Sequence, residues 1–234
     1  MLRSNILRKI KVRIKVLVRI MNDLICGTYF KFPKKGKNTP PFTYAVTITQ
    51  EIKPAETFDN KIYNLTLASK KINQYIIMPN QIFSFWNIIG NPETQFKKGR
   101  SIVSGKMSEE SGGGLCQVSG IIYYAGLLSG LEVLERHNHS IDIYTDKTRF
   151  TPLGTDATVV YGYKDLRLRN NLGFPFRLNL EVAGNTISIN LQTPEKLHEK
   201  KLLFYTENTD GYNNVNVYDK HKTLLNQSKY MKKS

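Results

Sequence analysis

Cysteine is scarce in this chain, and its scarcity limits the covalent frameworks that the fold can use. Among 234 residues, only Cys26 and Cys116 are cysteines. Two cysteines in a chain of this length do not make a disulfide framework, although one bridge between them is the alternative. Because Cys26 lies in a basic segment and Cys116 in the expected core, we interpret both as thiols, which is typical of a reducing compartment.

Long hydrophobic runs are also missing. No uninterrupted apolar stretch reaches the roughly 18 residues that a bilayer-spanning helix needs. The N-terminus lacks the apolar region and small-residue cleavage site of a secretory signal, because cations interrupt it throughout. We therefore expect a cytoplasmic protein, with a peripheral position at the inner face of the membrane as the refinement.

Acidic residues are absent from the first 22 residues, although the whole chain carries a net charge of +15. Seven cations lie there: Arg3, Arg8, Lys9, Lys11, Arg13, Lys15 and Arg19. A charge of this sign attracts nucleic acid, anionic lipid or acidic polymers. No recognisable nucleic-acid-binding motif accompanies it, so we expect no specific nucleic-acid partner.

The same N-terminal segment has two competing patterns. Apolar residues recur at spacings of three and four between Ile6 and Leu24, which predicts one stripe of an amphipathic helix over residues 5–25. Residues 10–16 alternate at period two, which is a strand pattern. The length and the lack of turn residues favour the helix. It either lies on an anionic membrane surface or docks on the main domain.

The rest of the chain predicts an α+β fold, in which an antiparallel β-sheet packs against a few helices and a Gly-rich loop leads into a helix that starts at a cysteine. We expect three parts: residues 1–41 as basic segment and Pro/Lys linker, 42–193 as the main domain, and 194–234 as an extension with a β-hairpin and a basic tail. Helices are expected at 62–75 and from Cys116 to Gly130. A polar loop is expected at 106–114, and extended segments at 44–50, 100–105, 131–144, 157–163, 166–169, 176–182, 186–191, 213–218 and 223–226. Residues 82–86 are expected to form a strand or a tight loop.

Residues 112–119 read GGGLCQVS and are the most informative stretch. Three glycines, a cysteine and an apolar run predict a thiol at a helix N-terminus, where unpaired N–H groups and the helix dipole favour thiolate. Such a cysteine can act as a nucleophile. The alternative is that Cys116 is a small buried hydrophobe and that the glycines only allow close packing.

Candidate partners for this thiol follow in the sequence. In a regular strand over 131–144, Glu135, His137 and His139 would share one face. Two such histidines with Cys116 resemble a zinc site, but the spacing is common by chance and no fourth ligand is specified, so we expect neither metal nor cofactor. A histidine that lowers the thiol pKa is the sharper interpretation, with Asp156 orienting it or merely forming a turn.

Arg136, beside these histidines, also has two interpretations. Its guanidinium could bind a substrate carboxylate through two parallel hydrogen bonds. It could instead form a structural ion pair with Glu135 or Asp156, which we favour.

Taken together, these segments resemble the VanW family. The resemblance extends over roughly residues 60–182 and is carried by NQIFSF at 80–85, Gly90, GGGLCQVS at 112–119, GLE at 130–132, ERHNHS at 135–140, GTDATVVYG at 154–162, Asp165-Leu166 and Asn170. This chain departs from the family where Ser-Thr-Thr often follows Cys-Gln-Val, since it has Ser119-Gly120-Ile121. It also lacks the membrane-spanning anchor of many relatives. The resemblance implies a bacterial cell-envelope and vancomycin-resistance context, with peptidoglycan or its precursors as partners, and names no reaction.

Two hypotheses about function follow. In the first, the protein is a cysteine-dependent hydrolase or transferase of acyl or amide bonds, with Cys116 as nucleophile, His139 as base and Asp156 orienting it. Backbone N–H groups of residues 114–117 would stabilise the oxyanion, and the chain order is similar to that of transglutaminase-like and papain-like folds. The expected substrate-binding residues are Gly113, Gly114, Gln117, Arg136 and His137. In the second, the protein is a non-catalytic module that binds peptidoglycan or a membrane surface, so the sequence leaves open whether it is an enzyme.

Overall fold

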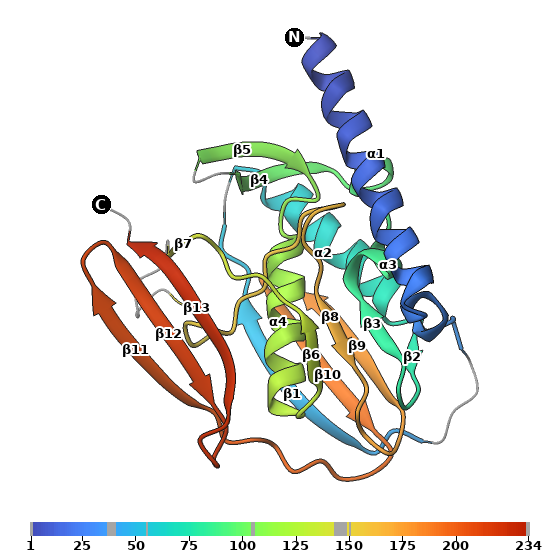
Figure 1. Ribbon diagram of the computed structural model, residues 1–234, viewed down its shortest axis with the longest axis vertical. Helices are drawn as coiled ribbons and strands as arrows, with labels where there is room; N and C mark the ends of the chain where they lie inside the picture. The colour runs from blue at the N-terminus through green and yellow to red at the C-terminus, as the bar shows by residue number, and fades with distance from the viewer. Residues whose placement is uncertain are drawn as a thin grey trace.

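A central helix, α4 (Leu115–Leu128), organises the protein (Figure 1). The computed structural model describes residues 2–36, 41–54, 56–103, 106–142, 149 and 151–232. Ten of the fourteen α4 residues are buried, which is the expected pattern for a helix that is apolar on all sides and enclosed by other elements. Gly130, with φ of +72°, follows the helix end in the left-handed conformation, as predicted.

The main sheet supplies the largest apolar surface against α4. Its strand order is β1-β10-β9-β2, and every pair is antiparallel. These strands are β1 (Tyr44–Glu51), β2 (Ile76–Ile77), β9 (Phe176–Ala183) and β10 (Thr186–Thr193). Alternate residues of β10, namely Ile187, Ile189 and Leu191, are buried, as expected for a strand with one face on the core. Helix α2 (Phe58–Ile72) packs on the same sheet beside α4.

Two smaller sheets complete the body. The first, β3-β8-β6, contains β3 (Ile82–Ser84), β6 (Glu132–Glu135) and β8 (Arg167–Arg169), with the short helix α3 (Phe85–Ile89) after β3. Gly126 lets α4 approach this sheet closely, because a Cβ atom at position 126 would lie 2.9 Å from the side chain of Leu168 in β8. The second is the hairpin of β4 (Lys98–Val103) and β5 (Lys106–Ser111), preceded by a 3-10 turn at Pro92–Thr94.

The C-terminal sheet has a small core of its own. It has the order β11-β12-β13-β7, from strands β7 (Ile141–Asp142), β11 (Leu203–Thr209), β12 (Tyr212–Tyr218) and β13 (Leu224–Lys232). Val215, Val217 and Tyr230 are buried between this sheet and the body. Figure 1 shows it on the opposite side of α4 from α1. The predicted hairpin is confirmed and gains a third strand, whereas the proposed three-part division of the chain stays a prediction.

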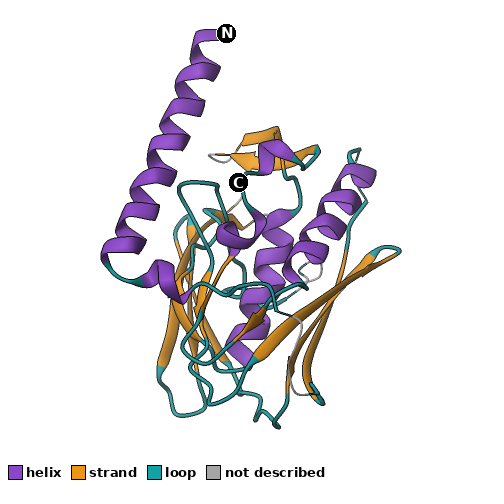
Figure 2. Ribbon diagram, turned by 90° about the vertical axis from the view of Figure 1, so that its right-hand side faces the viewer, coloured by secondary structure: helices purple, strands orange, loops and turns teal. Residues whose placement is uncertain are grey.

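Helix α1 (Leu2–Ile25) runs along the side of the body and extends beyond it toward the N-terminus (Figure 2). A 3-10 turn follows it at Thr28–Lys31. The helical interpretation of the N-terminal segment is therefore confirmed. Within the described residues, no helix is long and apolar enough to cross a membrane.

Antiparallel sheets packed on helices confirm the predicted α+β class, but three local predictions are wrong. Residues 106–111 form β5, where we expected a loop. The expected strand over 131–144 is interrupted, since β6 ends at Glu135, residues 136–140 are irregular, and Ile141–Asp142 form β7; residues 143–148 lie outside the described part. Residues 157–163 form an irregular loop whose only bridge joins Val160 to Lys164. Part of the predicted linker, residues 37–40, also lies outside the described residues.

Candidate functional site

A cleft of about 1430 Å³ opens beside the N-terminus of α4. Gly113, Gly114, Cys116 and Gln117 line it from the α4 side. Loop residues His139 and Asp156 line it as well, although they follow different strands in the sequence. The cleft therefore contains all three residues to which sequence analysis assigned catalytic roles.

The glycines fix the backbone on which Cys116 is placed. Gly112 and Gly114 have φ values of +89° and +99°, a conformation that residues with a side chain rarely adopt. Gly113 contacts the β4 backbone, since a Cβ atom there would lie 2.6 Å from Gly99. Cys116 consequently occupies the first turn of α4, partly exposed and packed against the main core.

His139 joins the thiol to Asp156. Its Nδ1 lies 2.6 Å from Asp156 Oδ2, and its backbone N–H donates to the same oxygen over 2.7 Å. The imidazole also interacts with the sulfur of Cys116, which lowers the pKa of the thiol and raises the pKa of the ring. Because Nδ1 faces Asp156, Nε2 is the ring nitrogen left for the thiol. The thiol itself donates to the Val159 carbonyl oxygen at 3.8 Å.

The electrostatics of these three side chains favour a pair of a Cys116 thiolate and a His139 imidazolium. Burial disfavours the imidazolium, but the hydrogen bonds to Asp156 and Cys116 outweigh burial and raise the pKa of His139 to about 10. Burial likewise opposes ionisation of the thiol, but the His139 hydrogen bond and charge hold the pKa of Cys116 below its usual value. Although Asp156 is also buried, His139 and Arg136 keep the pKa of its carboxyl well below the usual range.

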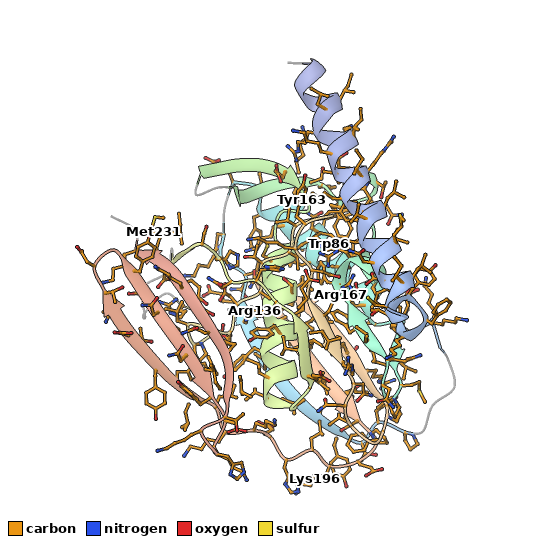
Figure 3. The ribbon with its side chains drawn as sticks, viewed as in Figure 1. Trp86, Arg136, Tyr163, Arg167, Lys196 and Met231 are labelled. Atoms are coloured by element: carbon orange, nitrogen blue, oxygen red, sulfur yellow. The ribbon has the colours of Figure 1, made fainter. Side chains whose placement is uncertain are left out.

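Asp156 is itself held by groups on its far side. Arg136 Nη2 donates to Asp156 Oδ1 over 2.9 Å, and Arg136 Nε donates to the Asp156 carbonyl over 2.7 Å. The hydroxyl of Tyr230, from β13, donates to the same Oδ1. Arg136 also contacts Ser228 Oγ at 2.5 Å. Figure 3 shows Arg136 between α4 and the C-terminal sheet, which it links to Asp156.

Two of the five expected substrate-binding residues lie away from the cleft. The side chain of Arg136 is only 5% exposed, and its donors contact protein acceptors. His137 turns to Glu135, with Nε2 at 3.1 Å from Oε1. Gln117 does line the cleft, although its Nε2 donates to the Glu51 carbonyl over 2.8 Å. Because His137 points away from Cys116, the zinc-like trio does not assemble.

Hydrogen bonds in the first turn of α4 show which backbone N–H groups of residues 114–117 are free to bind an oxyanion. Leu115 N–H donates to the Gly112 carbonyl over 3.1 Å, and Gln117 N–H donates to the Gly114 carbonyl over 2.9 Å. Within the described residues, the N–H groups of Gly114 and Cys116 have no such acceptor. These two groups are therefore the candidate donors to a developing negative charge. Among all the residues that the structure describes, no group of three His, Cys, Asp or Glu side chains is arranged to hold a metal ion.

Sequence reasoning missed the walls of the cleft. Trp86 and Tyr161 line it as an edge-to-face pair with ring centroids 5.4 Å apart. Helix α1 adds Val12 and Val16. Lys61 of α2 also lines it, and its stem packs beside Gly114. No spacing in the sequence connects Trp86, Tyr161, Lys61 and the α1 residues, because these four groups lie in separate parts of the chain.

Comparisons with known proteins identify the family of the chain. A vancomycin B-type resistance protein, VanW, from Enterococcus faecalis is 32% identical over 122 residues, which are 51% of this chain and 44% of that protein. An uncharacterised Bacillus subtilis protein, YoaR, is 30% identical over 159 residues, 65% of this chain and 51% of that protein. The chain thus spans about half the length of the curated relatives it matches, and no solved structure matches it. Since the model of VanW-like proteins matches residues 60–192, more than half of the chain, the protein belongs to the VanW-like family, as the sequence resemblance predicted.

Proposed function

We propose that the protein is a cysteine-dependent acyl-transfer enzyme, a hydrolase or transferase of amide or ester bonds. One observation carries the proposal: an open cleft brings Cys116, His139 and Asp156 together, with Nδ1 of His139 2.6 Å from the Asp156 carboxylate. A nucleophile, a base in contact with it and a third group that orients the base are the parts that nucleophilic catalysis needs.

In the first step, the Cys116 thiolate attacks the carbonyl carbon of the substrate. A carbon–sulfur bond forms, and the carbonyl π electrons move to oxygen, where the N–H groups of Gly114 and Cys116 are placed to stabilise the charge. As the carbonyl re-forms, the bond to the leaving group breaks. The leaving amine or alcohol takes the Nε2 proton of His139, which leaves a thioester and a neutral imidazole.

In the second step, His139 acts as a base. It removes a proton from water or an acceptor amine, which attacks the thioester and expels the Cys116 thiolate. The imidazolium is restored, and the cycle closes without another reagent. Asp156 keeps Nδ1 protonated and Nε2 toward the sulfur, because both its oxygens are already positioned by His139, Arg136 and Tyr230.

The family supports a substrate in the bacterial cell envelope. One relative is named for vancomycin resistance, and we extend that context to this chain as part of the proposal. Acyl and amide bonds of peptidoglycan or its precursors are the substrates that this reasoning favours. The alternative, a non-catalytic binding module, differs in one physical respect: its Cys116 would be an ordinary packing residue.

Alkylation kinetics separate these possibilities. Because Cys26 is exposed, iodoacetamide alkylation should be followed in a Cys26→Ser background, with Cys116→Ala to define the residual signal. We expect the rate to titrate with an apparent pKa below about 8.5, the value for an unperturbed thiol. His139→Gln should slow the reaction at neutral pH by about tenfold or more, whereas His221→Gln, in an exposed turn, should not.

Folding is checked on the same samples by circular dichroism and thermal unfolding. A thiol that titrates at or above about 8.5, and whose alkylation is indifferent to His139→Gln in a folded variant, would refute catalysis and leave the binding module.

A further inference from the structure

One face of α1 attaches the helix to the body. Its partly or fully buried residues are Val12, Val16, Arg19 and Asp23, which recur at spacings of four and three. Asp23 accepts two hydrogen bonds from Arg167, at 2.6 and 2.8 Å, and Arg19 pairs with Glu135. These ion pairs fix the orientation of the helix and therefore determine which face points outward.

The opposite face of α1 is a broad apolar surface that no other part of the described residues covers. Its large hydrophobic side chains are each 39% to 79% exposed: Ile6, Leu7, Ile10, Ile14, Leu17, Val18, Ile20, Met21, Leu24 and Ile25. A contiguous exposed patch of this kind marks an interaction surface. Figures 1 and 2 both show this helix at the edge of the molecule.

Cations border the exposed apolar face on both sides. Each residue turns an α-helix by about 100°, so Lys9 and Arg13 lie along one edge and Lys11 and Lys15 along the other. Of these, Lys9 also pairs with Glu93 of the body at 3.6 Å. No acid occurs before Asp23. An apolar stripe between two basic edges matches the chemistry of an anionic bilayer, which offers a hydrocarbon interior below a layer of phosphates.

We propose that α1 is a lipid-binding surface that docks the protein on an anionic bilayer, with its apolar face in the acyl region and its lysines at the headgroups. A second copy of the chain is the rival occupant, because residues 10, 14, 17, 21 and 24 have heptad spacing. In such a coiled coil, however, Lys11 and Arg13 would flank the seam with no acidic residue to pair with, because none occurs before Asp23. The apolar face also spans more of the helix circumference than a coiled-coil seam needs.

Docking would place the cleft beside the membrane. Val12 and Val16, on the inward side of the same helix, line the cleft that contains Cys116. The backbone of α1 passes close to the body here, since a Cβ atom at Gly162 would lie 3.3 Å from the Val12 carbonyl oxygen. The proposal does not depend on the acyl-transfer function, and Cys116→Ala should bind lipid as well as the wild-type protein.

Flotation of the full chain with lipid vesicles tests this. The probes are phosphatidylcholine vesicles, with and without added phosphatidylglycerol. We expect binding only to the anionic vesicles, and weakening as salt is raised. Met21→Glu should reduce the partition coefficient about tenfold, and Lys11→Gln about fivefold. Met78→Glu is the matched control, because Met78 is also exposed (46%) but lies on the turn after β2.

Three results would overturn the proposal: no binding to anionic vesicles, equal binding to neutral vesicles, or equal loss with Met78→Glu. A fourth result that would overturn the proposal comes from light scattering. A stable dimer without lipid that Met21→Glu dissociates would assign the surface to a second copy of the chain.

Discussion

His139 and Asp156 are joined twice through one oxygen, since Oδ2 accepts both the backbone N–H of His139 and its Nδ1–H. This double contact fixes the position of the backbone and the tautomer of the ring together. The other carboxylate oxygen is occupied by Arg136 and Tyr230. Asp156 therefore connects His139, Arg136 and Tyr230 structurally, in addition to the orienting role that we propose for it.

Asp156→Asn should accordingly have two measurable effects. An amide cannot stabilise the imidazolium as a carboxylate does, so the pKa of His139 should fall and that of Cys116 should rise. Alkylation of Cys116 at neutral pH should therefore slow. The variant also leaves the buried Arg136 without its counter-ion, which should lower the free energy of unfolding by about 3 kcal/mol. Urea unfolding and iodoacetamide kinetics check the two effects separately, and an unchanged alkylation rate in the folded variant would remove Asp156 from the site.

The pH dependence of stability provides a second prediction. In the folded protein the raised pKa of His139, about 10, means that the ring keeps its proton above about 6.5, where the unfolded ring loses it. This contribution is complete below about 6.5 and is lost as pH rises toward 10. The lowered pKa of Cys116 acts oppositely: its contribution is complete above the unfolded value of about 8.5 and is lost as pH falls through the folded value.

Between about pH 6.5 and 8.5, the folded pair and the unfolded pair bind the same total number of protons. The pair therefore makes the free energy of unfolding neither rise nor fall with pH in this range. Cys116→Ser removes the contribution of the thiol and leaves that of His139. Relative to wild type, the variant should lose stability as pH rises from about 6.5 to 8.5, by about 1 kcal/mol, because the 38% exposed imidazole is partly screened by solvent. Urea unfolding at several pH values measures it. A constant difference between the two proteins would contradict the ion pair.

Local signals explain which parts of the fold were predictable from sequence. The glycines before Cys116 and Gly130 after the helix define both ends of α4, and the turn at 183–185 separates two alternating strands. By contrast, residues 157–163 have β-branched and aromatic side chains that suit a strand, yet long-range contacts shape them into a loop. The Thr158 N–H, for example, donates to the His137 carbonyl over 2.7 Å.

The candidate site likewise has features that local sequence predicts and features that depend on long-range contacts. Residue type and chain order singled out Cys116, His139 and Asp156, which the structure places in one cleft, because few residue types can fill the proposed roles. The contact of Tyr230 with Asp156 spans 74 residues and leaves no trace in local spacing. Strand β5 was missed for a related reason: it pairs only with β4, and its polar sequence lacks the alternation that identifies a strand on a core.

Glycine substitutions on either side of Cys116 should have opposite effects on stability. Gly113→Ala places a Cβ atom 2.6 Å from the Gly99 backbone, so β4 must shift; we expect a loss of about 2 kcal/mol. Gly120 lies within α4, and its Cβ atom would come no closer than 3.7 Å to another residue. Gly120→Ala should therefore stabilise the protein by about 0.5–1 kcal/mol. Chemical denaturation compares the two, and destabilisation by Gly120→Ala would show that the space beside Asp156 is tighter than described.

The charge around the thiol gives the last prediction. Lys53 and Lys61 line the same cleft as Cys116, and burial together with the charge of Lys53 lowers the pKa of Lys61. The Lys61 stem packs beside Gly114, where a Cβ atom would lie 2.9 Å from Lys61 Cγ. This positive potential should favour anionic reagents at the sulfur. In the Cys26→Ser background, Lys61→Met should reduce the rate with iodoacetate about threefold more than the rate with neutral iodoacetamide, and added salt should shrink the difference. Lys70→Met, on an exposed part of α2, is the control. Equal slowing of both reagents would mean that Lys61 affects the reactivity of the thiol itself and does not select for charge.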